Sequence, residues 1–143
     1  MRLMGLDLGE RTLGVALSDA TGTLATGREI IRRDSENKLR ETIRRIEEIV
    51  RQEEVGRIVL GLPLYLDGHM SPRAEKTLAF RNRLESRLGI PVIMQDERLT
   101  SVEAEERMRE AGLPRSKWKD HVDSIAAEII LQDYINGHGK DEV

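Results

Sequence analysis

Three short apolar segments separated by two turns open the chain, and they restrict its possible folds more than any later feature does. Residues 3–8 and 13–18 flank the turn Gly9-Glu10-Arg11, and residues 24–31 follow a second turn at residues 19–22. Glycine and aspartate between short apolar runs are typical of turns that join antiparallel strands. This opening segment therefore predicts a three-stranded antiparallel meander, in which Gly27 weakens the third strand.

Helical and strand patterns alternate through the rest of the chain. A helix over residues 34–53, capped by Asp34 or Ser35, carries apolar residues at helical spacing. Ser71-Pro72 is a helix start, and Gly89 is the matching stop. The other expected elements are strands over residues 57–62 and 90–95 and helices over residues 100–112 and 120–136.

Strands that alternate with helices pair in parallel, whereas the opening meander is antiparallel. The expected fold class is therefore α/β, with a mixed five-stranded sheet (antiparallel meander, then parallel strands) and helices on both faces. At 143 residues, without a linker or an internal repeat, the chain predicts a single domain over residues 1–137. Residues 138–143 are expected to form a flexible C-terminal tail.

Composition excludes several functional classes. The chain has no cysteine, so disulfides, thiolate metal sites and cysteine nucleophiles are excluded. The net charge of −3 argues against a protein that coats nucleic acid with its whole surface, but it allows a local basic patch. No apolar run approaches the roughly 18 residues of a membrane span. The N-terminus lacks the pattern of a signal peptide, so we expect a cytoplasmic protein.

Asp7 interrupts an otherwise apolar strand. An isolated buried charge is too unfavourable to persist, so this carboxylate must be paired, hydrogen-bonded, protonated or bound to a metal. It lies near the C-terminal end of its strand, where open α/β sheets bind their ligands. The structural alternative is a side chain that caps the turn at Gly9.

Two further acidic positions follow: Asp96-Glu97 after the fifth strand, and Asp123 in the first turn of the last helix. Each has a structural alternative, because Arg98 could neutralise one acid and the helix dipole stabilises a first-turn acid. Together with Asp7 they predict a site for Mg²⁺ or Mn²⁺, since hard cations prefer oxygen ligands and promote phosphodiester cleavage.

Basic residues fall in loops expected near the same edge of the sheet. Arginine and lysine are the usual contacts to phosphate. The candidate nucleic-acid-binding residues are Arg11, Arg98, Arg115, Lys117 and Lys119. Trp118 lies within this basic stretch and could either stack on an unpaired base or anchor its own loop.

Read together, these segments resemble the YqgF family, also called RuvX, of RNase H-like nucleases. The matching segments are residues 5–11, 14–19, 61–63, 96–101, 122–127 and 130–132, together with Gly68. The resemblance implies an RNase H-like fold, a Holliday junction resolvase-like nuclease and processing of the pre-16S rRNA 5′ end. It also implies that Asp7, Glu97 and Asp123 are the metal-binding catalytic acids, with Asp96 as the competitor of Glu97 and Asp120 as a candidate fourth acid.

The resemblance further implies that the partners are nucleic acid, either pre-rRNA or branched DNA, and ribosomal particles, for a protein that is a monomer or homodimer. Two alternatives stay open at the level of the sequence. One is an ATP-binding module of the actin and sugar-kinase type, which opens with a similar hairpin. The other is a non-catalytic RNA-binding factor in ribosome assembly. Three acids gathered in one place argue against it, because such a cluster is destabilising unless it has a function.

Overall fold

A single five-stranded sheet forms the centre of the molecule. The computed structural model describes residues 1–97 and 100–138, and it gives only the helical backbone for Thr100, Ser101, Lys119, Asp120, Asp123 and His138. The strands are β1 (Arg2–Leu8), β2 (Thr12–Ser18), β3 (Ala25–Arg32), β4 (Val55–Leu62) and β5 (Val92–Asp96). They lie in the order β3-β2-β1-β4-β5, with the first three antiparallel and β4 and β5 parallel to β1. The predicted mixed sheet is confirmed.

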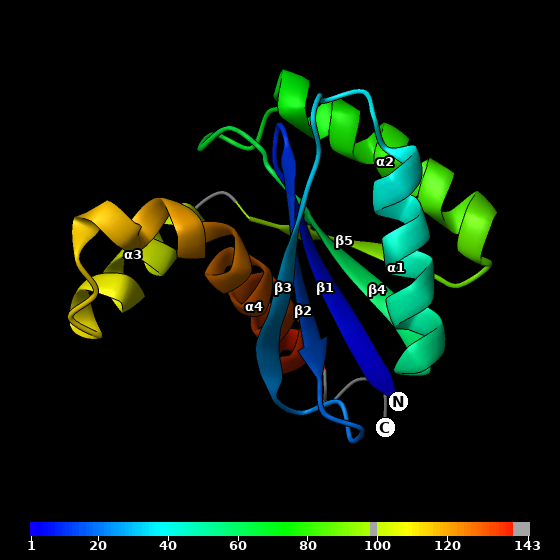
Figure 1. The fold of residues 1–143 in the computed structure, drawn as a ribbon, viewed down its shortest axis with the longest axis horizontal. Helices are drawn as coiled ribbons and strands as arrows, with labels where there is room; N and C mark the ends of the chain where they lie inside the picture. The colour runs from blue at the N-terminus through cyan, green and yellow to red at the C-terminus, as the bar shows by residue number, and fades with distance from the viewer. Residues whose placement is uncertain (98–99, 139–143) are drawn as a thin grey trace.

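Helices cover both faces of this sheet (Figure 1). They are α1 (Arg40–Gln52), α2 (Pro72–Leu88), α3 (Thr100–Glu110) and α4 (Trp118–His138), with a short 3₁₀ turn, η1 (Arg115–Lys117), before α4. The two ends of α2 follow the sequence signals, because the Ser71 hydroxyl accepts the Ala74 N–H at 2.9 Å and Gly89 ends the helix at φ 69°. No helix within residues 1–97 and 100–138 combines the length and apolar character needed to cross a membrane.

The predicted start of the first helix is wrong. The helix begins at Arg40, and Leu39, not Asp34 or Ser35, precedes it, without a side-chain cap. The cause lies at the end of β3, where the Arg33 N–H donates to the Arg11 carbonyl at 2.7 Å and prolongs the pairing with the β1–β2 turn. The chain then needs residues 34–39 to travel from the sheet to the start of α1.

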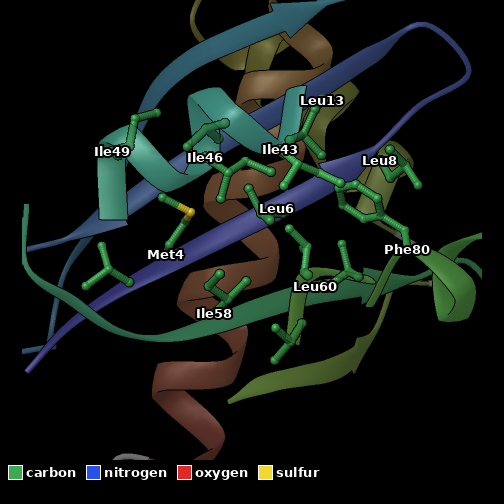
Figure 2. Close-up of a cluster of buried hydrophobic side chains, with 14 of the residues drawn as sticks. Met4, Leu6, Leu8, Leu13, Ile43, Ile46, Ile49, Ile58, Leu60 and Phe80 are labelled. Carbon is green, nitrogen blue, oxygen red and sulfur yellow. The ribbon is translucent and has the colours of Figure 1, made fainter. Parts of the chain in front are cut away.

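Two apolar cores lie on opposite faces of the sheet. Because side chains alternate along a strand, Met4, Leu6 and Leu8 of β1 point toward α1 and α2, as Figure 2 shows. The intervening residues of β1 face α4, where Leu3 joins the second core. Asp7 shares this α4 face with Leu3 and Gly5. The fold therefore decides which side of the sheet any site at Asp7 must occupy.

Glycine and alanine residues let α4 lie very close to the sheet. A Cβ atom added to Gly5 would lie 2.6 Å from the Leu131 Cβ and 2.8 Å from the Ala127 carbonyl oxygen. Gly27 of β3 is equally tight, since its Cβ would meet the Ser124 hydroxyl at 2.5 Å. The strand pairing shifts register next to this residue, between Val15 and Ala16 of β2. The weak point predicted at Gly27 is therefore an irregularity beneath α4.

Gly5→Ala should destabilise the protein by about 1–3 kcal/mol, because α4 is rigid backbone at this contact and must move away from the sheet. Urea unfolding of the purified variant would measure the loss. Gly137→Ala is the matched control, since a Cβ there meets nothing within 4 Å, and alanine in a helix should stabilise by up to about 1 kcal/mol. Equal stability of Gly5→Ala and wild type would contradict the close packing.

Candidate functional site

The C-terminal ends of three parallel strands bring Asp7 and Glu97 to one edge of the sheet. Asp7 is the penultimate residue of β1 and lies opposite Gly14 of β2. Glu97 directly follows β5, and its N–H donates to the Leu62 carbonyl at the end of β4, at 3.2 Å. This backbone bond fixes Glu97 beside the strand that separates it from Asp7.

The Glu97 side chain folds back over Gly61 of β4. A Cβ atom on Gly61 would lie 2.8 Å from the Glu97 carboxyl carbon and 2.6 Å from the Ile130 Cδ1 of α4. The carboxyl group thus occupies a space between the sheet and α4 that any larger residue at position 61 would fill. Gly61 is therefore a position where a side chain approaches the strand backbone closely.

Electrostatics couple the two acids. Burial, the charge of Asp7, a hydrogen bond with Asp7 and the charge of Asp96 together raise the pKa of the Glu97 carboxyl well above its usual range. Without a cation, these effects favour the protonated form of Glu97, hydrogen-bonded to Asp7. Two half-buried carboxyl groups in contact are an oxygen donor set suited to a divalent cation.

Asp96 and Glu97 differ in their surroundings. Asp96 ends β5 and is exposed, whereas Glu97 is largely enclosed and contacts Asp7. Alternation along β5 explains this difference: Val92 and Met94 pack in the α1–α2 core, and Ile93 packs beneath α4. Glu97 continues the Ile93 series, so the geometry favours Glu97 over Asp96 as the partner of Asp7.

The third acid, Asp123, lies in the helical backbone of α4, and its side chain falls outside the described part of the structure. It directly precedes Ser124, whose hydroxyl lies against Gly27. The same limit applies to Asp120, the candidate fourth acid. Within the described residues no group of three or more histidine, aspartate or glutamate side chains is arranged to hold a metal. The described half of the proposed site is the Asp7–Glu97 pair.

The candidate basic residues divide between two places. Arg11 is exposed on the β1–β2 turn at the site edge. Arg115 and Lys117 are exposed in η1, and this connection lies beyond α3, at the end of the molecule remote from α1 and α2 (Figure 1). Arg98 and the Lys119 side chain lie outside the described residues.

Trp118 anchors its own loop. Its indole N–H donates to the Leu113 carbonyl at 2.9 Å, and the guanidinium groups of Arg115 and Arg109 lie 5.2 and 5.8 Å from the ring centroid. Of the two roles considered for Trp118, the loop anchor is the one that these contacts fit.

Two arginines near the acids were not predicted from the sequence as site residues. Arg73 lies in the first turn of α2 and lowers the pKa of Glu97 through its charge, against the effects of burial and Asp7. Arg33 is 8% exposed, and its guanidinium donates to the carbonyls of Gly9, Glu10 and Thr12 in the β1–β2 turn. The sequence did contain a hint of the position of Arg73. This residue directly follows the Ser71-Pro72 helix start, at the end of the loop after β4.

Comparison with known proteins identifies the family. The family described as RuvX, Holliday junction resolvase, matches residues 1–137. The chain belongs to the RuvX family. A relative from Agathobacter rectalis named "Putative pre-16S rRNA nuclease" is 48% identical over 136 residues, which cover 95% of each chain.

Solved structures support the fold. RuvC of T. thermophilus in complex with a Holliday junction substrate aligns with a TM-score of 0.55 at 15% identity, covering 97% of this chain and 96% of that one. The fowlpox virus Holliday junction resolvase aligns with a TM-score of 0.56 at 15% identity, covering 96% and 99%. The expected RNase H-like fold is confirmed. Membership of this nuclease family confirms the expected nuclease and decides against the ATP-binding module.

The raised pKa of Glu97 predicts that the metal-free protein loses stability as pH rises. Its proton contributes stability fully below the ordinary pKa of 4.5, and this contribution is lost toward the raised value, by at most about 1.4 kcal/mol per pH unit. Glu97→Gln, which cannot ionise, should therefore unfold at higher urea than wild type at pH 8 in EDTA, with the difference shrinking toward pH 5.

Glu105→Gln on the exposed surface of α3 is the matched control and should keep the wild-type pH dependence. Parallel stability curves for wild type and Glu97→Gln across this pH range would show that Glu97 ionises freely in the folded protein.

Proposed function

We propose that this chain is a divalent-metal-dependent endonuclease that hydrolyses phosphodiester bonds in structured RNA, as in processing of the 5′ end of pre-16S rRNA. The observation that supports it most is the contact between the carboxyl groups of Asp7 and Glu97, two acids from distant parts of the chain, at the end of the sheet where such folds bind ligands. The name carried by relatives at nearly half identity supports the choice of RNA.

The residues that would hold Mg²⁺ or Mn²⁺ are Asp7, Glu97 and Asp123. Bound there, the cation would activate a water molecule and neutralise charge on the phosphate. The protein supplies the rest of the site. Gly61 and Ile130 hold the Glu97 carboxyl against the sheet, and Arg33 holds the turn that follows Asp7.

Arg11, Arg98, Arg115, Lys117 and Lys119 are proposed as contacts to the nucleic-acid backbone. The ribosomal particle that carries the precursor RNA would be the physiological partner. Branched DNA is the second candidate substrate, because the family description names Holliday junction resolvase.

Asp7→Asn should reduce metal-dependent cleavage of structured RNA by roughly 10³-fold or more, since it removes a proposed ligand of the cation. The variant should fold normally, because asparagine has nearly the same size as aspartate and its amide oxygen can still accept a hydrogen bond from the Glu97 carboxyl group. Cleavage rates in Mg²⁺ and in EDTA, with an RNA and a four-way DNA junction as substrates, would measure the effect. Asp96→Asn, on the exposed neighbour of Glu97, should lose less than about tenfold. Cleavage by Asp7→Asn at the wild-type rate would refute the proposal.

Gly61→Ala tests the placement of Glu97. The added Cβ meets the ends of two side chains, Ile130 and Glu97, which can move without shifting the backbone. We expect a stability loss of about 1 kcal/mol and a loss of cleavage of at least about tenfold, because the carboxyl group leaves its position. Circular dichroism and cleavage assays on one preparation would separate the two effects, and full activity would show that Glu97 acts from elsewhere.

A further inference from the structure

A cavity with a strongly basic rim lies on the opposite face of the sheet from the acid pair. Its volume is about 240 Å³, and its apolar floor includes Leu8 and Phe80, which lie side by side in Figure 2. Leu8 directly follows Asp7 in β1, so the cavity and the acid pair meet at the same strand end.

The rim holds more positive than negative charge. Arg33, Arg73, Lys76 and Arg83 line it with a single acid, Glu36. That acid is already engaged, because the Lys76 ammonium donates to it and the Arg73 guanidinium lies 3.8 Å away. Within the described residues no carboxylate pairs with Arg83. An anion would relieve this excess.

Arg33 adds a buried and incompletely satisfied donor to the rim. It is 8% exposed, and its Nε atom has no hydrogen-bond partner among the described residues, although its other nitrogens hold the β1–β2 turn. Burial and the neighbouring charge of Arg73 lower the pKa of this guanidinium. Two arginines held together in a partly buried space are typical of sites that receive an anion.

Arg73 connects the cavity with the acid pair. Its charge acts on the Glu97 carboxyl, and its side chain lines the cavity. The cavity and the acid pair therefore share the electrostatic influence of one side chain. A second hollow shares Arg73 and Lys76 and extends past Tyr65, which is 54% exposed, to Glu10 of the β1–β2 turn. The surface is thus continuous from the cavity to the site edge.

We infer that this cavity binds a backbone phosphate of the strand that the acid pair cuts, an inference that rests on the proposed nuclease function. The chemistry that recognises the ligand is a phosphate oxygen facing arginine and lysine donors, with no base-specific contact. The cavity would position the strand next to the scissile bond and would not contribute to sequence specificity.

The test uses the double variant Lys76→Gln/Arg83→Gln, since both side chains are exposed and neither contacts Asp7 or Glu97. Binding of a fluorescent structured RNA to the full-length protein in EDTA would be measured over a range of salt concentrations. We expect roughly tenfold weaker binding and a salt slope shallower by about 0.7–0.9, for the loss of one phosphate contact.

Arg44→Gln/Arg51→Gln is the matched control, because it removes the same charge from exposed positions of α1 outside the cavity. If the cavity variant and this control have the same salt slope, the inference is wrong. That result would not affect the proposed function, which depends on cleavage by the wild-type protein. Conversely, cavity-dependent RNA binding by a wild type that cleaves nothing would support the phosphate site and refute the nuclease.

A terminal phosphate offers the same chemistry as a backbone phosphate. RNA of one sequence with a 5′-phosphate or a 5′-hydroxyl separates the two sources. An equal loss of affinity for both RNAs in the double variant supports the backbone phosphate. A loss confined to the 5′-phosphorylated RNA would overturn the inference in favour of a terminal-phosphate pocket.

Discussion

The close approach of α4 to the sheet is the constraint on which the rest of the structure depends. Gly5 and Gly27 leave no room for a side chain between strand and helix, so α4 lies directly on the strands. The same approach encloses the Glu97 carboxyl between Gly61 and Ile130. A carboxyl group in such a poorly solvated space interacts strongly with its neighbours, and its coupling to Asp7 follows from the packing.

This arrangement lowers the stability of the fold. Two enclosed acids oppose folding when no cation is bound, and apolar burial on both faces of the sheet must offset that cost. Arg33 adds a second constraint, because its three hydrogen bonds hold the turn that follows Asp7. The acid is therefore fixed from both sides, by the sheet before it and by a clamped turn after it. Such rigidity is what a preorganised site requires.

Local chemistry made much of the fold predictable, and the rest depends on tertiary contacts. The caps of α2 could be read from Ser71, Pro72 and Gly89, because each acts within one turn of helix. The start of α1 could not, since it depends on how far Arg33 prolongs the pairing of β3. The choice between Asp96 and Glu97 was undecidable because β5 is apolar on both faces, so its sequence does not reveal which face meets α4.

Overall charge is a poor guide to this protein's affinity for phosphate. The net charge is −3, yet charges separated by more than about 8 Å are largely screened at physiological salt. The field at a phosphate is therefore set by the few side chains around it. Arg73 illustrates this: in the sequence it looks like an ordinary residue of a charged helix, and only the fold brings its charge to act on Glu97. A protein with a net negative charge can therefore bind a negatively charged polymer, provided that its acidic side chains are gathered where a cation can bind.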